Sequence, residues 1–126
     1  MQKLDVTGAL IAIVDDEQSV RTALSNLLCS VGYETVLFES AEAVLQSELL
    51  GDIDFMVLDV KLKGMSGIEL FEQLNAAGVI IPTLFISGYA DFNTQLRIAR
   101  AGALLFLSKP VDVDILLQTI DDIVNN

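Results

Sequence analysis

Five polar side chains that could do chemistry together follow short apolar runs along the chain: Asp15, Asp16, Asp59, Ser87 and Lys109. Each has an ordinary explanation when it is taken alone. Asp15 or Asp16 would suit a helix cap, and Asp59 a turn. Ser87 would likewise suit a turn, and Lys109 the solvated surface. The carboxyl ends of parallel strands meet at one edge of a sheet, however, so the five side chains together predict one site.

Three carboxylates close together on one rim, the edge where the strands end, are electrostatically unfavourable. Two carboxylates a few ångströms apart repel each other by roughly 4 kcal/mol at an effective dielectric of 20. A bound dication would relieve this repulsion, and Mg²⁺ (or Mn²⁺) suits a site with oxygen ligands only. A carboxylate beside such an ion can act as a nucleophile on a phosphoryl group, with the ion and a lysine holding the charge on the transferring oxygens. Asp59 is the candidate nucleophile.

Short apolar runs alternate along the whole chain with segments whose apolar residues have helical periodicity. This alternation predicts an α/β three-layer sandwich, with five helices around a five-stranded parallel sheet. The strand order 2-1-3-4-5 would place Asp15 and Asp16 on one side of the reversal in strand order and Asp59 on the other. The predicted strands cover residues 9–14, 35–38, 55–58, 83–87 and 103–107.

Helical stripes and caps predict the intervening elements. One stripe consists of Val20, Leu24, Leu27 and Val31, and the helix over 91–100 has only Phe92, Leu96 and Ala99. That helix is the weakest, and therefore the one most able to shift. Ser66 with Glu69 predicts a capping box, and Ser40 a second cap. The remaining expectations are a last stripe of Val113, Leu116, Leu117, Ile120, Ile123 and Val124, and helix ends with positive φ at Gly32, Gly51, Gly78 and Gly102.

Composition excludes several classes of protein. A chain of 126 residues with 52% hydrophobic content predicts one domain over 1–126, with its core at about 9–124. A formal charge of −11 argues against nucleic-acid binding, and the absence of histidine removes the commonest general base. The single cysteine, the lack of a secretory signal and the shortness of the apolar runs predict a cytoplasmic protein that neither spans nor binds a membrane.

Four motifs in this order resemble those of the receiver domains of two-component response regulators, the CheY-like fold. The motifs are IVDDE, LDVKLKGMSG, FISGYAD and GALLFLSKP, and the resemblance covers about residues 9–124. It implies that Asp59 accepts a phosphoryl group from a sensor histidine kinase or a phosphotransfer protein. The chain would then catalyse its own phosphorylation and dephosphorylation, without being a conventional enzyme.

The resemblance also implies a role for each site residue. Asp16 and Asp59 would ligate Mg²⁺ together with the backbone carbonyl of Lys61, and Asp15 would act mainly through water. Lys109 would pair with the phosphoryl oxygens.

Further roles concern the switch and the loops. Ser87 would swing toward the phosphoryl group, and Phe106 would then turn inward, although it lacks the hydroxyl of a tyrosine. The bond before Pro110 is similar to one that is cis in the family. Lys61 and Tyr89 occupy positions that modulate phosphoryl hydrolysis. Lys63 stands where the family usually has a proline, which predicts a looser loop.

The implied output face combines the helix over 91–100, the strand over 103–107 and the helix over 113–124. It would dimerise, or release an attached output domain, on phosphorylation. The motifs look closest to receivers of transcription factors of the FixJ or NtrC kind, which implies a DNA-binding output domain outside this chain.

Three other functions remain as alternatives. A haloacid-dehalogenase type phosphatase needs an acid two residues after its nucleophile, and this chain has Lys61 there. A flavodoxin-like carrier needs a phosphate loop after the first strand, where DDEQSV would repel a flavin phosphate. A receiver-like interaction domain that is never phosphorylated stays open, because an acidic set does not prove turnover.

Overall fold

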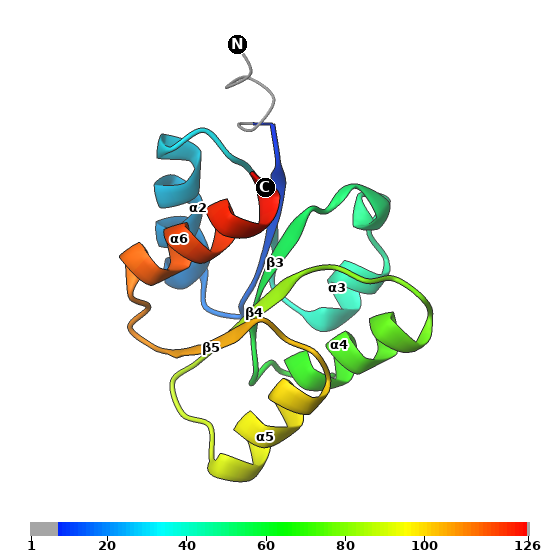
Figure 1. Cartoon of the computed structure of the whole chain (residues 1–126). Coiled ribbons are helices and arrows are strands. Elements are labelled where there is room, and N and C mark those ends of the chain that lie inside the picture. Colours follow the sequence, from blue (N-terminus) through cyan, green and yellow to red (C-terminus); the bar gives the residue numbers. More distant parts are fainter. Residues whose placement is uncertain (1–7, 126) are drawn as a thin grey trace.

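The structure is a computed structural model of the chain, and it describes residues 8–125. Its strands form one parallel sheet in the order β2-β1-β3-β4-β5 (Figure 1), as predicted. The first seven residues, on which part of the argument against a secretory signal rests, lie outside the described range. The strands are β1 (Leu10–Val14), β2 (Glu34–Phe38), β3 (Phe55–Asp59), β4 (Thr83–Ser87) and β5 (Leu105–Ser108).

Helices cover both faces of this sheet, which confirms the three-layer sandwich (Figure 1). α2 and α6 pack on one face, and α3, α4 and α5 pack on the other. Along the described residues, no helix has both the length and the apolar character that crossing a bilayer requires. The helices are α2 (Gln18–Ser30), α3 (Ala41–Leu45), α4 (Gly67–Ala76), α5 (Phe92–Arg100) and α6 (Val113–Val124), with a short 3₁₀ helix, η1 (Leu50–Asp52).

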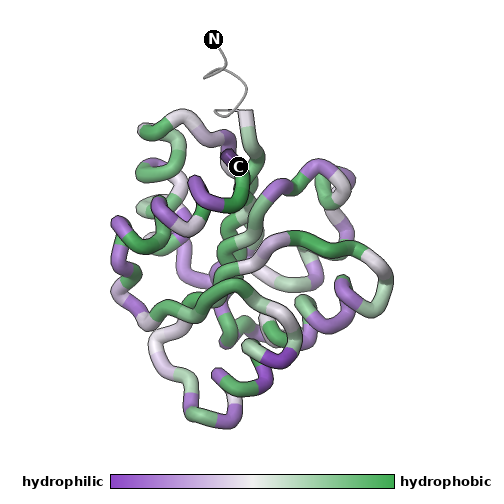
Figure 2. Tube along the Cα trace, viewed as in Figure 1, coloured by the Kyte–Doolittle hydropathy of each residue, from purple (hydrophilic) through white to green (hydrophobic). Residues whose placement is uncertain are grey.

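The middle strands are apolar because both of their faces are covered. All five residues of β3 are buried, and the four apolar ones alternate between the two cores. Met56 and Leu58 face the α3, α4 and α5 side, whereas Phe55 and Val57 face α2 and α6. Figure 2 shows this apolar centre with more polar helix surfaces around it. Asp59 therefore ends a strand that has no solvent-facing side.

Side-chain caps fix where α3 and α4 begin, as they also do for α5 and α6. Ser66 accepts a hydrogen bond from the backbone N–H of Glu69, whose carboxylate accepts one from the Ser66 N–H, so the predicted capping box is confirmed. Ser40 likewise accepts from the N–H of Ala43 at the start of α3. Both caps lie beside the carboxyl edge of the sheet.

The prediction for helix-ending glycines is correct at Gly32, Gly78 and Gly102 and wrong at Gly51. The first three have positive φ, between 81° and 101°. Gly51 lies inside η1 without a positive φ, because the chain continues there in a 3₁₀ turn.

Some predicted apolar stripes have the wrong phase. In α2, Leu28 is fully buried whereas Val31, the residue that follows the helix, is 47% exposed. In α5, the buried residue is Ile98, while Phe92 and Ala99 are exposed. A short helix with few apolar residues fits more than one face, so tertiary packing decides the phase.

The ends of the last two elements also differ from the prediction. β5 begins at Leu105 and not at residue 103, because the N–H of Ala103 still bonds to the carbonyl of Ile98 at the end of α5. In α6, Leu116 and Ile120 are buried, but the predicted stripe residues Val113 and Ile123 are exposed.

Candidate functional site

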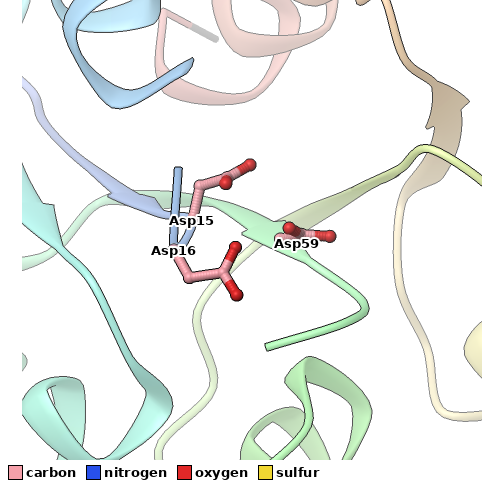
Figure 3. Close-up of side chains that lie close together, drawn as sticks. All are labelled: Asp15, Asp16 and Asp59. Carbon is pink, nitrogen blue, oxygen red and sulfur yellow. The ribbon is translucent and has the colours of Figure 1, made fainter. Parts of the chain in front are cut away.

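The three predicted carboxylates meet at the carboxyl edge of the sheet. Asp15 and Asp16 follow β1, and Asp59 ends the neighbouring strand β3 (Figure 3). One oxygen from each lies within 4.8 Å of the others. Asp15 and Asp59 are buried, whereas Asp16 is half-buried.

Backbone contacts hold Asp15 in place. Its N–H donates to the carbonyl of Phe38 at 3.1 Å, so the end of β2 supports it. Its Oδ1 accepts the N–H of Glu17 at 2.8 Å, and its carbonyl accepts from Arg21 Nη1 at 2.6 Å. The start of α2 therefore fixes the direction of the Asp15 carboxylate.

Asp59 is held by the loop that follows it. The N–H of Lys61 donates to Asp59 Oδ1 at 3.2 Å, and the N–H of Gly67 donates to the carbonyl of Val60 at 2.9 Å. A Cβ atom at Gly67 would lie 2.0 Å from the backbone oxygen of Asp59. The absence of a side chain at Gly67 thus lets the start of α4 approach the Asp59 backbone.

Lys109 joins the acidic rim from the loop after β5. Its ammonium lies 2.9 Å from Asp15 Oδ2, 3.1 Å from Glu17 Oε1 and 3.2 Å from Asp59 Oδ2. Its N–H donates to the carbonyl of Ser87 at 2.8 Å. The Lys109–Pro110 peptide bond is cis. The lysine is therefore part of the site and not a free surface charge.

The site shifts two pKa values. Burial, followed by the Asp15 charge, raises the pKa of Asp59 to about 6, although the Lys109 ammonium opposes this. Burial lowers the pKa of Lys109, but its hydrogen bonds to Asp15 and Glu17 and the carboxylate charges outweigh that effect and raise it. Near neutral pH, the site thus has an ionised Asp59 and a charged lysine.

The donor set fits a hard divalent cation. It offers carboxylate oxygens from two neighbouring strands, with neither histidine nor thiol among them. Asp15 Oδ2 is buried, and its close partner within the described residues is the Lys109 ammonium, 2.9 Å away. One ammonium does not neutralise three carboxylates, so a bound cation would reduce the repulsion that remains among them.

Ser87 lies at the end of β4, but its hydroxyl does not contact Asp59. It donates to the carbonyl of Tyr89 at 2.7 Å and accepts the Tyr89 N–H at 3.1 Å. The Lys61 ammonium lies 5.4 Å from the centroid of the Tyr89 ring. Lys61 and Tyr89 thus contact each other beside the acidic rim, from the loops after β3 and β4.

Phe106 lies further from the carboxylates, in β5 opposite Phe85. It is half-buried and packs against the core cluster beneath α3, α4 and α5. Its ring therefore belongs to the same layer as the weak helix α5.

Glu17 is a site residue that sequence reasoning missed. Its carboxylate pairs with Lys109, although its side chain is 61% exposed. The IVDDE motif contains this third acidic residue, but a glutamate at a helix start is ordinary. Only the position of Lys109 in three dimensions reveals the pair.

The chain is similar to known proteins in sequence and in structure. A family model described as the response regulator receiver domain matches residues 11–121. The structure superposes on that of a response regulator receiver protein from Pseudoalteromonas atlantica with a TM-score of 0.86 at 32% identity, over 92% of this chain and 97% of that one.

The chain is also similar in sequence to curated relatives over most of its length. The chain is 41% identical over 104 residues to nodulation protein W of Bradyrhizobium diazoefficiens, which is 82% of this chain and 46% of that protein. It is 31% identical over 116 residues to the transcriptional regulatory protein FixJ of Rhizobium meliloti, which is 92% of this chain and 57% of that protein. The chain thus spans about half the length of the curated relatives it matches.

Proposed function

The chain belongs to the family of response regulator receiver domains, and on that premise we propose that it accepts a phosphoryl group on Asp59. The donor would be a phosphohistidine of a sensor histidine kinase or of a phosphotransfer protein. The observation that carries this proposal is the convergence of three carboxylates and the Lys109 ammonium on one rim.

Asp59 acts as the nucleophile. Because the pKa of Asp59 is raised to about 6, the side chain is mostly ionised near neutral pH and yet retains the basicity of a poorly solvated carboxylate. One carboxylate oxygen attacks phosphorus, and the bond from phosphorus to the donor nitrogen breaks. The electron pair stays on the imidazole, and the product on Asp59 is an acyl phosphate.

The residues that would hold Mg²⁺ (or Mn²⁺) are Asp16, Asp59 and the backbone carbonyl of Lys61, with Asp15 acting through water. A bound cation supplies positive charge that offsets both the carboxylates and the phosphoryl oxygens. The cluster of carboxylates at the ends of β1 and β3 supports this assignment.

Lys109 has to exchange a carboxylate contact for a phosphoryl contact. Its ammonium lies against Asp15, Glu17 and Asp59. Glu17 is the exposed partner, so its contact costs least to give up. Lys109 would then donate to the phosphoryl oxygens while Asp15 still holds it.

The switch would begin at Ser87. Its hydroxyl would leave the Tyr89 backbone and turn toward the phosphoryl group, and Phe106 would follow inward. α5, β5 and α6 form the face that these changes would alter. Lys61 and Tyr89, which contact each other beside the rim, would modulate how fast the acyl phosphate is hydrolysed.

The output of the switch would be a homodimer through that face, or release of a DNA-binding domain in a longer protein. Two observations support this: a relative is named a transcriptional regulatory protein, and the chain spans only part of its length. The domain itself is strongly acidic, which disfavours direct contact with nucleic acid.

Incubation with acetyl phosphate and Mg²⁺, followed by intact-mass measurement, tests the function. Wild type should gain the mass of one phosphoryl group, and the gain should disappear in Asp59→Asn or on chelation of the metal. Asp52→Asn, which changes an exposed carboxylate before β3, serves as the matched control and should still gain the mass. No gain in the wild type would favour an interaction domain that is never phosphorylated.

A further inference from the structure

The loop between β3 and α4 carries the proposed cation ligand at Lys61, yet few backbone hydrogen bonds hold its centre. Its start is fixed by the N–H of Val60 on the carbonyl of Ile86, and its end by the Ser66 capping box. Lys63 stands in the middle, and among the described residues its N–H donates no hydrogen bond. The side chains of Leu62 and Met65 pack against the core, so side-chain contacts restrain the centre of the loop.

One side chain from another element reaches this loop. The Glu42 carboxylate, in the first turn of α3, accepts the N–H of Met65 through Oε2 at 2.9 Å. It also lies over Gly64, where an added Cβ would come within 2.7 Å of Oε2. Gly64 has φ of +78°, a conformation that favours glycine. The loop is thus shaped to receive the Glu42 carboxylate.

The position of Glu42 is itself well supported. Ser40 caps α3, and Val44 anchors the same short helix in the core. The backbone hydrogen bond from Met65 is the main cause that lowers the pKa of Glu42, so the carboxylate that accepts it stays ionised through the neutral range.

The segment from the end of β2 to α3 also supports Asp15, on the side of the site that follows β1. Phe38, at the end of β2, accepts the N–H of Asp15 at 3.1 Å. Four residues later, Glu42 holds the N–H of Met65. The segment from the end of β2 to α3 therefore contacts both Asp15 and the loop that follows Asp59.

We propose that Glu42 is a positioning residue that sets the loop between β3 and α4, and thereby the cation affinity of the acidic rim. It does not touch the cation. It acts through the Met65 N–H, which holds the loop so that the Lys61 carbonyl stays near the carboxylates. This inference rests on the proposed cation site and adds a residue outside it.

The test measures Mg²⁺ affinity of the unphosphorylated chain by calorimetry, and amide hydrogen exchange of Met65 without metal. Glu42→Ala should weaken Mg²⁺ binding by about threefold to tenfold, as expected for the loss of one ordinary hydrogen bond. It should also speed Met65 exchange. Glu42→Gln keeps an oxygen acceptor at the same reach, so its affinity should stay within about twofold of the wild type.

A matched control variant distinguishes loss of the hydrogen bond to Met65 from loss of a negative charge. Glu48→Gln removes an exposed carboxylate just beyond α3 and should change neither measurement. If Glu42→Gln weakened Mg²⁺ binding as much as Glu42→Ala, the effect would be one of charge, and the inference would fail. An unchanged affinity and unchanged Met65 exchange in Glu42→Ala would also overturn it.

A proline at position 63 provides a second test. The described non-glycine residues have no positive φ, and the Lys63 N–H is unbonded among them, so Lys63→Pro removes no hydrogen bond and stiffens the loop. Glu42→Ala should then cost less affinity in the Lys63→Pro background than in the wild type. An equal cost in both backgrounds would show that Glu42 does not act through the loop.

Failure of the inference differs from failure of the proposed function. If the wild type binds no Mg²⁺, the proposed cation site is wrong, and with it the effect of Glu42 on affinity. The exchange measurement needs no metal, so it still decides whether Glu42 holds the loop. If the wild type binds Mg²⁺ and Glu42→Ala binds it equally well, only the inference is lost.

Discussion

The Asp59 carboxylate is subject to opposing influences. Burial and the Asp15 charge disfavour its ionised form, while the Lys109 ammonium and the Lys61 N–H favour it. The net result is a pKa of about 6, above the ordinary value for an aspartate. The proposed nucleophile thus destabilises the metal-free fold when it is charged.

This predicts how stability depends on pH. Because the folded-state pKa of Asp59 is raised, the folded state binds the proton more tightly than the unfolded state does. The chain therefore loses stability as pH rises from about 4 through 6. In chelator at pH 7.5, Asp59→Asn should be more stable than the wild type by about 1–3 kcal/mol.

Urea unfolding at several pH values measures this difference. The gap between Asp59→Asn and the wild type should shrink toward pH 4.5, where the wild-type carboxyl is protonated. A gap that does not change with pH, or a variant less stable at pH 7.5, would contradict the assigned electrostatics.

The Glu17 side chain leads to a second prediction about a single residue. Its exposed carboxylate competes for Lys109 and repels anionic donors. A unit charge about 6 Å from a phosphate in nearly aqueous surroundings opposes its approach by about 0.7 kcal/mol, or about threefold in rate. Glu17→Gln should therefore be phosphorylated by acetyl phosphate about threefold faster at low salt, with the difference falling as salt rises. A rate equal to that of the wild type, or slower, would show that Glu17 is not a competitor.

The residue types and spacing predicted that Asp15, Asp16, Asp59 and Lys109 meet, because strand ends in a parallel sheet share an edge. They did not predict the bond between the Ser87 hydroxyl and the Tyr89 backbone, nor the tether from Glu42 to the loop. These depend on side-chain directions that only the assembled structure determines.

At the scale of elements, the start of α4 is the tightest junction near the site. The Gly67 N–H bonds to the carbonyl of Val60, and its Cα faces the Asp59 backbone and Leu58. No side chain fits between them.

Gly67→Ala should therefore destabilise the chain by about 2 kcal/mol or more, because the added methyl group forces α4 away from β3. Gly51→Ala is the control, since a Cβ there would meet nothing within 4 Å and the backbone has no positive φ. It should change stability by less than about 0.5 kcal/mol. Equal effects of the two substitutions in urea unfolding would refute the close approach at Gly67.

The elements themselves were predictable where burial is continuous. β3 and β4 are buried throughout and apolar apart from Asp59, Thr83 and Ser87 at their ends, so their positions followed from their composition. α5 was harder, because its buried residue is Ile98 and the larger Phe92 is exposed. Its face depends on packing against β5, which no local pattern encodes.

At the scale of the whole molecule, the proposed output face carries exposed apolar side chains. Phe92, Leu104, Val113 and Ile115 are all exposed large hydrophobic residues on or beside α5, β5 and α6. Exposed large apolar side chains suit contact with another protein surface.

Dimerisation can be tested by sedimentation with and without beryllofluoride and Mg²⁺. The mimic should increase the mass of the wild type, and Phe92→Ser should weaken that association by about tenfold or more if the ring is a central contact. Leu49→Ser is the control, since Leu49 is also an exposed large hydrophobic residue, at 43%, and lies between α3 and η1, outside α5, β5 and α6. An unchanged mass, or equal weakening by both substitutions, would reject this face as the dimer interface.

The central claim is that the rim binds a divalent cation and a phosphoryl group together at Asp59. The most direct measurement is ¹⁹F NMR of beryllofluoride with the intact chain. A bound resonance should appear for the wild type with Mg²⁺, and vanish when Mg²⁺ is chelated or when Asp59 is replaced by Asn. A bound signal without Mg²⁺ or with Asp59→Asn, or no bound signal for the wild type, would contradict the claim.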